Sequence, residues 1–313
     1  KAMNCPLHHL IFPKLVESYR DLPLRLAEYG QCYRNELSGV LTGLLRVRSM
    51  KMNDAHIYCR KDQIESEIEG VLSLIKEYYR IFGLKQYSFR LSLRDPKNKE
   101  KYIDDPGWEF AEDVLRKVLK KLKLQFVEAK DDAAFYGPKI DVQFKNVYGR
   151  EETMSTVQLD LAAKSRFDLK YDDADGKKNS EVFVIHRAPL STHERFLAFL
   201  IEHFAGRFPL WLAPVQVKIT TVNEGNMKFA KEVMNKMKEN GIRVELDDRN
   251  ESIPKKVRDA EVEKVPIIVP IGDKEVEKKT LALRTRDGKV KFGVKIDELI
   301  KELKEKISKR ELG

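Results

Sequence analysis

The chain has 313 residues, of which 42% are hydrophobic and 35% are charged, a globular composition that allows about two domains and excludes a disordered chain. No apolar run reaches the roughly 18 residues of a membrane helix, and residues 1–10 lack a signal pattern. Three cysteines are too few for a disulfide framework. We therefore expect a protein of the reducing cytoplasm, without a membrane partner.

The net charge is +9 and the pI about 9.2. Over half of the excess lies in residues 213–313, which contain 24 basic and 19 acidic side chains. An excess of this kind favours a polyanionic partner such as a nucleic acid. The composition fits a Lys- and Glu-rich surface of the thermophile type equally well.

The first two-thirds of the chain mixes strands with a few long helices. Apolar residues recur at helical spacing over 63–82, which predicts one long amphipathic helix. A second helix is expected over 108–122, after the stop signal Asp105-Pro106-Gly107, and a third over 195–204. Because strands often follow strands here, we expect an antiparallel sheet with flanking helices. Period-two alternation predicts strands at 87–93, 140–144, 156–161 and 181–186.

A domain boundary is expected near the segment 208–214, after which strands and helices alternate. This order is typical of a small α/β domain, an open mixed sheet with helices on both faces. About 100 residues suffice for such a domain. We therefore assign residues 1–212 to a first domain and 213–313 to a second. Strands are predicted at 215–221, 242–246, 265–270 and 281–286, and helices at 227–239, 254–263 and 296–308.

Two arginines flank a turn in the segment 33–48. Arg34 follows a predicted strand, and Arg46 lies on the returning arm of the hairpin. A planar guanidinium binds phosphate oxygens through two parallel hydrogen bonds, so this hairpin could clamp a phosphate. Surface salt bridges with Glu36 and Asp54 are the alternative. No Gly-x4-Gly-Lys-Ser/Thr loop occurs, which argues against an ordinary P-loop.

Cys5, His56 and His186 are candidate metal ligands. Thiolate and neutral imidazole are the usual ligands of zinc, and three protein ligands leave one position open for a substrate. The spacings of 51 and 130 residues match no metal motif. From spacing alone, a buried cysteine with two structural histidines is the better interpretation.

Short motifs follow one another along nearly the whole chain. Among them are Met3-Asn4-Cys5-Pro6, Tyr33-Arg34-Asn35-Glu36, Arg46-Val47-Arg48, Asp54-Ala55-His56-Ile57, Phe135-Tyr136-Gly137-Pro138-Lys139, Thr156-Val157-Gln158-Leu159-Asp160, Ile185-His186-Arg187-Ala188, Glu194-Arg195-Phe196 and Gly272-Asp273-Lys274-Glu275. In this order they resemble the threonyl-tRNA synthetases, a family of class II aminoacyl-tRNA synthetases. The resemblance implies a class II antiparallel catalytic sheet in residues 1–212 and an α/β anticodon-binding domain in residues 213–313.

The resemblance also implies a zinc site, against the interpretation from spacing. Cys5, His56 and His186 match the ligands of a Zn²⁺ that binds the amino and hydroxyl groups of threonine. Asp54 matches the carboxylate that receives the hydroxyl. A hydrophobic pocket separates threonine from valine only weakly, whereas a site that binds the hydroxyl rejects the methyl analogue strongly. Two further residues match the lining of the amino-acid pocket, with ordinary packing as the alternative: Tyr136 and Gln158.

ATP is the second substrate that the resemblance implies, together with Mg²⁺. Arg34 matches the arginine that binds the α-phosphate, and Arg195 the one that holds the γ-phosphate. Glu36 and Arg46 match neighbours on the nucleotide-binding hairpin. Lys139 lies where the family has a cation near the reacting carboxylate and phosphate. Activation is then an in-line attack of the threonine carboxylate on the α-phosphate, which needs positioning and charge neutralisation.

In the second domain, Asn250, Glu275 and Arg284 match positions that contact anticodon bases. Arginine pairs with guanine and carboxylate with an amino group, and loop bases expose these edges. For Glu275, a solvated loop charge is the alternative. The implied partner is tRNA(Thr), and the family is expected to act as a homodimer.

The chain departs from the family pattern in two places. Met52 stands where a glutamine usually faces the active site, and Thr153 and Met154 replace glutamine and cysteine. We also expect the helix and strand of the dimer interface to precede Lys1, and we assign no editing of mischarged serine to these 313 residues.

The sequence therefore predicts ATP-dependent ligation of L-threonine to tRNA(Thr) through threonyl-adenylate. A prolyl or histidyl synthetase is the first alternative, and bound zinc would separate it. A non-catalytic RNA-binding relative is the second, although Arg34, Arg195 and Lys139 argue against it. A Lys- and Glu-rich structural protein would have no use for the zinc ligands.

Overall fold

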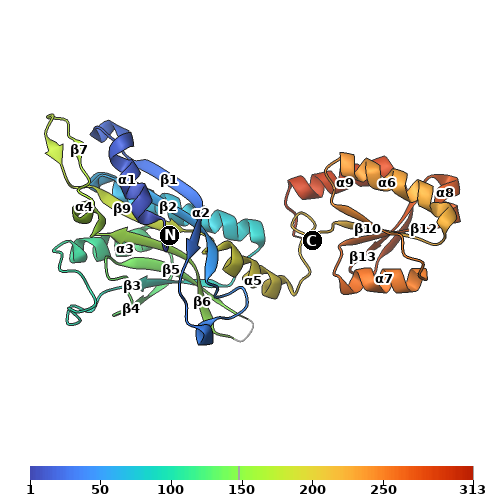
Figure 1. The fold of residues 1–313 in the computed structure, drawn as a ribbon, viewed down its shortest axis with the longest axis horizontal. Coiled ribbons are helices and arrows are strands. Elements are labelled where there is room, and N and C mark those ends of the chain that lie inside the picture. Colours follow the sequence, from blue (N-terminus) through green and yellow to red (C-terminus); the bar gives the residue numbers. More distant parts are fainter. Residues whose placement is uncertain (147–148, 313) are drawn as a thin grey trace. The chain divides into compact units, whose positions relative to one another are not determined.

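The computed structural model describes residues 1–146 and 149–312 (Figure 1). They fold as two compact units, Lys1–Leu200 and Ile201–Gly313. The division falls within a helix, α5 (His193–Phe204), about a dozen residues before the domain boundary that the sequence predicts after residue 212. Among the described residues, no helix has the length and apolar character needed to cross a membrane.

A seven-stranded sheet forms the centre of the first unit, in the order β1-β2-β9-β6-β5-β3-β4. Its neighbours pair antiparallel except for β3 and β4, so the antiparallel sheet predicted from the sequence is confirmed. The strands are β1 (Leu24–Tyr33), β2 (Ser49–Cys59), β3 (Tyr87–Ser92), β4 (Phe126–Ala129), β5 (Lys139–Lys145), β6 (Glu151–Asp160) and β9 (Phe183–Ala188), and a separate small hairpin joins β7 (Tyr171–Asp172) to β8 (Lys178–Asn179).

Long helices accompany this sheet (Figure 1). In α2, buried side chains recur at helical spacing, Glu65 and Glu67 occupy the first turn, and Gly83 ends the helix with a positive φ of 68°. The Tyr79 hydroxyl of α2 forms a hydrogen bond with Ser155 of β6, so α2 covers one face of the sheet. The helices of this unit are α1 (Cys5–Leu15), α2 (Ile64–Phe82), α3 (Trp108–Lys121), α4 (Ala163–Arg166) and α5.

The opposite face of the sheet carries polar side chains. Successive residues of a strand point to opposite faces, so apolar Val157 and Leu159 of β6 alternate with Gln158 and Asp160. Helix α1 lies on the polar face, where His9 Nδ1 is 2.8 Å from the Tyr58 hydroxyl of β2. Helix α1 therefore covers part of the polar face of the sheet.

The second unit has a five-stranded mixed sheet in the order β11-β10-β12-β13-β14, with three parallel strands followed by two antiparallel ones. Helices cover both faces, as predicted: α6 and α9 lie on one face and α7 on the other (Figure 1). The elements are β10 (Val217–Thr221), α6 (Met227–Glu239), β11 (Val244–Asp247), α7 (Ile253–Val262), β12 (Ile267–Ile271), α8 (Asp273–Lys278), β13 (Leu281–Thr285), β14 (Val290–Val294) and α9 (Ile296–Ser308).

Candidate functional site

One cross-strand row brings together four of the residues singled out in the sequence. His56 of β2 lies opposite His186 of β9, His186 lies opposite Gln158 of β6, and Gln158 lies opposite Lys139 of β5. Directly opposed residues of antiparallel strands point to the same face. Residues far apart in the chain therefore share the polar face beneath α1.

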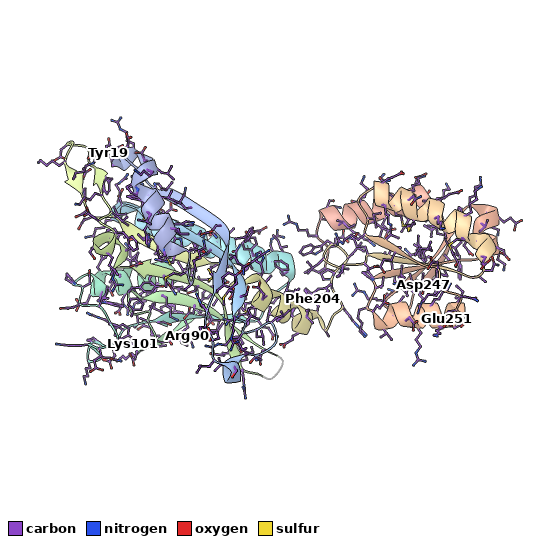
Figure 2. All side chains as sticks on the ribbon, viewed as in Figure 1. Tyr19, Arg90, Lys101, Phe204, Asp247 and Glu251 are labelled. Atoms are coloured by element: carbon purple, nitrogen blue, oxygen red, sulfur yellow. The ribbon has the colours of Figure 1, made fainter. Side chains whose placement is uncertain are left out.

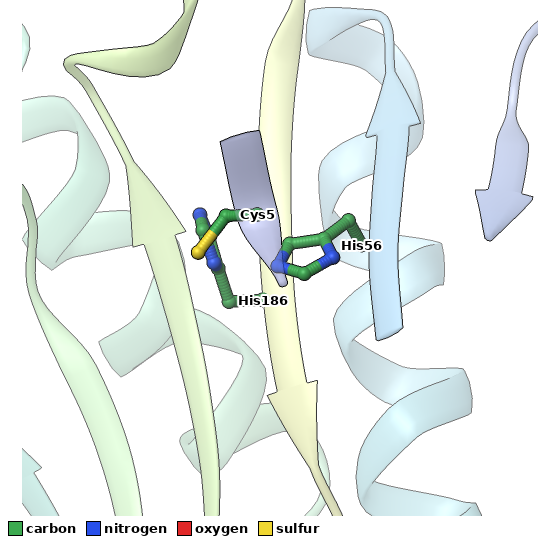
Figure 3. A group of neighbouring side chains, drawn as sticks. All are labelled: Cys5, His56 and His186. Carbon is green, nitrogen blue, oxygen red and sulfur yellow. The ribbon is translucent and has the colours of Figure 1, made fainter. Parts of the chain in front are cut away.

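Cys5, His56 and His186 form a group that could hold a metal ion (Figure 3). Cys5 comes from the first turn of α1, and the three ligand atoms lie within 4.8 Å of one another. His56 is fully buried, yet its Nε2 has no hydrogen-bond partner among the described residues. A buried polar atom without a partner is costly, and a Cys/His/His donor set is the one that zinc prefers. These residues therefore fit a zinc ion.

The other nitrogens of the two histidines are already bound. His186 Nε2 is 2.7 Å from Asp160 Oδ2, and His56 Nδ1 is 2.8 Å from His8 Nδ1. His8 Nε2 in turn lies 3.2 Å from Glu28 Oε1. Outer partners of this kind fix the tautomer and orientation of metal-binding imidazoles.

Electrostatics matches this arrangement. Burial lowers the pKa of His56, which keeps the ring in the neutral form that binds metals. Burial also opposes charge on His186, but hydrogen bonds with Asp160 and Cys5 raise its pKa to about 9. A bound cation would displace that proton. Asp160, His186 and His9 form a second possible group, but both oxygens of Asp160 are occupied, one by His186 and one by backbone N–H groups of α4.

A cavity of about 420 Å³ opens beside two of the candidate ligands, Cys5 and His186. Tyr136 and Gln158 line it and are joined by a hydrogen bond from the Tyr136 hydroxyl to Gln158 Oε1. Gly137 holds this wall close to β6, because a Cβ at this position would lie 1.8 Å from the Leu159 carbonyl oxygen. The predicted site residues that line the cavity are Cys5, Arg34, Asp54, Tyr136, Gln158 and His186.

Asp54 of β2 lines the cavity. It lies two residues before His56 in the strand, so the two side chains point to the same face of the sheet. Its Oδ2 accepts a hydrogen bond of 3.2 Å from Asn4 Nδ2. Met52, one of the residues that depart from the family pattern, also lines the cavity, and its sulfur lies 3.7 Å from Arg34 Nη2.

The predicted arginine hairpin is present. Arg34 directly follows β1, Arg46 precedes β2, and the two strands pair antiparallel. Arg46 Nε is 3.1 Å from Glu36 Oε2, which is one of the salt bridges considered as the alternative to phosphate binding. Arg34 Nε instead donates to the Ala2 carbonyl oxygen at 3.3 Å. Arg195 of α5 reaches the same hairpin, with its Nε 3.0 Å from the Leu45 carbonyl oxygen. Arg46 and Arg195 thus contact the loop between β1 and β2, whereas Arg34 lines the cavity.

Lys139 is held by Asp141, a carboxylate only 1% exposed. Asp141 also accepts a hydrogen bond of 2.9 Å from the Thr156 hydroxyl and lies 3.8 Å from Arg90 Nη2. Arg90 is labelled in Figure 2. Asp141 therefore fixes the position of the Lys139 ammonium on the polar face.

In the second unit, the three candidate anticodon residues lie apart. Glu275 is in the first turn of α8, where its carboxylate accepts the Gly272 N–H at 3.0 Å, and Asn250 is exposed after β11. Arg284 of β13 lies opposite Ile268, near the beginning of β12, and its Nε is 2.8 Å from Glu261 Oε1. Glu275 follows the other end of β12, and that end lies roughly 10 Å along the strand from Ile268. The three residues could contact different nucleotides.

Sequence reasoning missed three residues of this site: Asn4, His8 and Asp160. Each lies within three positions of a predicted residue, Asn4 and His8 beside Cys5 and Asp160 two residues after Gln158. Residues two apart in a strand point to the same face of the sheet. Asp160 could therefore have been predicted as a site residue from Gln158.

Comparisons with known proteins identify the families of the two parts of the chain. Residues 1–204 match the family of the tRNA synthetase class II core domain (G, H, P, S and T), and residues 216–306 match the anticodon binding domain. A threonine–tRNA ligase of Geobacillus kaustophilus is 49% identical over 302 residues, 96% of this chain and 46% of that protein. A threonine–tRNA ligase of Listeria monocytogenes is 47% identical over 99% of this chain and 48% of its own length.

A solved structure is similar as well. The crystal structure of the RNA binding domain of threonyl-tRNA synthetase from Cryptosporidium parvum superimposes with a TM-score of 0.90 at 34% identity. The alignment covers 97% of this chain and 76% of that one. The chain described here spans about half the length of the curated relatives that it matches.

Proposed function

We infer the function from the family: the chain belongs to the class II tRNA synthetases and, within them, to the threonyl-tRNA synthetases. We propose that it catalyses ATP-dependent ligation of L-threonine to tRNA(Thr) through a threonyl-adenylate. The observation that carries this proposal is that Cys5, His186, Asp54 and Arg34 all line one cavity. Such a cavity can select a hydroxylated amino acid beside a phosphate-binding arginine.

Selection of threonine would rest on the polar face of the sheet. Cys5, His56 and His186 would hold a Zn²⁺ ion, which supplies a Lewis acid for the amino and hydroxyl groups of threonine. The Asp54 carboxylate would accept a hydrogen bond from the threonine hydroxyl. Valine places a methyl group there and leaves the carboxylate without its partner, a loss that apolar contacts cannot offset.

Activation of the amino acid would depend on three basic groups, of which Arg34 lines the cavity. The threonine carboxylate oxygen attacks the α-phosphorus of ATP, the bond from that phosphorus to the β-phosphate bridging oxygen breaks, and pyrophosphate leaves. Arg34 would neutralise the α-phosphate and Arg195 the γ-phosphate, with Mg²⁺ accompanying ATP. Lys139, fixed by Asp141, would neutralise charge near the reacting groups. No proton transfer is needed in this step, so positioning and charge dominate.

In the second step, a terminal ribose hydroxyl of tRNA(Thr) would attack the threonyl carbonyl carbon. The bond from that carbon to the phosphate oxygen breaks, AMP leaves, and the hydroxyl proton is released to solvent. The anticodon would be read by the second unit through Asn250, Glu275 and Arg284. Arg284 would exchange its ion pair with Glu261 for a base edge.

We also propose that the chain acts as a homodimer. Helix α1 exposes an apolar stripe at helical spacing, and β1 is an edge strand of the sheet. The side chains of the stripe are 42–63% exposed: Leu7, Leu10, Ile11 and Leu15. Light scattering coupled to gel filtration should give twice the 36.4 kDa chain mass, and the chain mass itself would contradict a dimer formed through α1 and β1.

Charging of tRNA tests the proposed function as a whole. With purified protein, threonine, ATP and tRNA(Thr) transcript, we expect threonine to become esterified to the transcript. The same transcript with an altered anticodon should be charged poorly. RNA binding without adenylate formation or charging would instead indicate a non-catalytic relative.

A further inference from the structure

Asn4 occupies an unusual place at the start of α1. It is the N-cap residue, where asparagine ordinarily accepts a hydrogen bond from the first turn, yet its side chain makes no capping hydrogen bond. The side chain is completely buried. Its Nδ2 donates to Asp54 Oδ2 at 3.2 Å, and its Oδ1 accepts from the Cys32 thiol at 3.4 Å. The amide therefore bridges α1, β1 and β2.

Gly30 provides the space for this amide. A Cβ built on Gly30 would lie 2.2 Å from Asn4 Oδ1 and 2.5 Å from both Cγ and Nδ2. Gly30 lies within β1, opposite Met52, and its φ is not positive. Glycine at this position therefore makes room for the Asn4 side chain, and it is not needed for an unusual backbone conformation. Glycine is unfavourable inside a strand, so its presence here indicates a close approach that the fold needs.

We propose that Asn4, seated on Gly30 and held by Cys32, is a positioning residue that fixes the Asp54 carboxylate for the side-chain hydroxyl of the amino acid. This inference rests on the proposed function. The Asn4 amide occupies Oδ2 of Asp54, which limits rotation of the carboxylate and leaves Oδ1 for a ligand. Recognition of a hydroxyl depends on such a fixed acceptor, because a misdirected carboxylate loses the hydrogen bond that distinguishes threonine from valine.

Two single variants disturb the amide from opposite sides. Asn4→Ala removes it, and Gly30→Ala leaves it intact but places a methyl group in its seat. We measure binding of threonine and of valine to the zinc-loaded chain by calorimetry, together with zinc content and binding of a non-hydrolysable ATP analogue. Each variant should reduce the preference for threonine over valine at least about tenfold, because a hydrogen bond to a charged group is lost or misdirected. Zinc content and affinity for the ATP analogue should remain within about twofold of wild type.

Gly70→Ala is the matched control. It also adds one methyl group at a glycine, but in open space on α2, and it should leave the preference for threonine unchanged. The double variant Asn4→Ala/Gly30→Ala should be no worse than Asn4→Ala alone, since the atoms that the new methyl group would contact are gone. A purely structural role of Gly30 would instead make the two losses multiply.

The outcomes are distinct. If wild type binds threonine no better than valine, the proposed function fails, and this inference fails with it. If wild type shows the preference and Asn4→Ala keeps it, the positioning role is wrong while the proposed function stands. If the double variant loses the threonine preference by the product of the two single losses, the proposed contact of Asn4 with Gly30 is likewise wrong. Should Gly30→Ala not fold, Asn4→Ala still decides the role of the amide, since it only removes atoms.

Discussion

His56 and His186 face each other as direct cross-strand partners of β2 and β9, with ring centroids 4.6 Å apart and planes at 85°. Although 130 residues separate them in the chain, the sheet register alone places both rings on the polar face, where α1 adds Cys5. The proposed metal centre is therefore a consequence of strand pairing. Any change that preserves the register but removes a ligand atom should abolish metal binding and leave the fold intact.

Cys5→Ala and His186→Ala should each lose the metal. Zinc measured by atomic absorption should fall from about one ion per chain to below about 0.1, because two remaining ligands do not hold a structural or catalytic zinc. His203→Ala, at an exposed histidine of α5 outside both candidate metal groups, is the control and should retain zinc. Full zinc occupancy in either Cys5→Ala or His186→Ala would end the zinc proposal.

His8→Ala should weaken zinc binding without removing a ligand. His8 bonds His56 Nδ1 and is itself held by Glu28, so its loss frees the His56 ring to rotate. We expect zinc affinity, measured by competition with a chelating dye, to fall about 10- to 100-fold. An unchanged affinity would show that His56 is oriented by its packing alone.

Arg284→Ala should impair charging of tRNA(Thr) by about 10- to 100-fold, the cost of one base contact, while threonyl-adenylate formation stays at wild-type rate. Lys309→Ala is the control, because it removes another exposed, ion-paired cation of the same unit and should lose little. Equal loss of both activities in Arg284→Ala would show that the anticodon assignment is wrong.

Gly137→Ala should destabilise the first unit by about 2–3 kcal/mol, because the new Cβ would meet the Leu159 carbonyl oxygen at 1.8 Å. Urea unfolding can be followed by the fluorescence of buried Trp108 in a Trp211→Phe background, since the chain has two tryptophans. Gly70→Ala should instead stabilise the same unit by up to about 1 kcal/mol, as alanine favours the helix. Wild-type stability in Gly137→Ala would mean that the loop does not pack on β6 as described.

Much of the fold could be predicted from the sequence. Helices α2 and α9 and strand β3 differ from their predicted bounds by one residue or none, since their apolar periodicity is strong. Helix α1 was missed, because Pro6 and Pro13 interrupt its pattern and its buried positions are partly histidine. Strand β14 was missed because four of its five residues are exposed, so that no alternation marks it.

The site could be predicted only in part. Motif order pointed to Cys5, His56 and His186, but nothing in the spacing places them together, since that depends on the register of β2, β9 and β6. The roles of Asn4 and His8 depend on three-dimensional contacts with Gly30 and His56, which no local pattern encodes.

ATP–pyrophosphate exchange with each of the twenty amino acids, on protein of known zinc content, tests the central claim most directly. Threonine should drive exchange, serine weakly and valine not at all, because the proposed zinc and Asp54 would bind the hydroxyl and Arg34 would bind the phosphate. Exchange driven equally by valine, or by an amino acid without a hydroxyl, would contradict the account. So would the absence of exchange with every amino acid in protein that still binds zinc and tRNA.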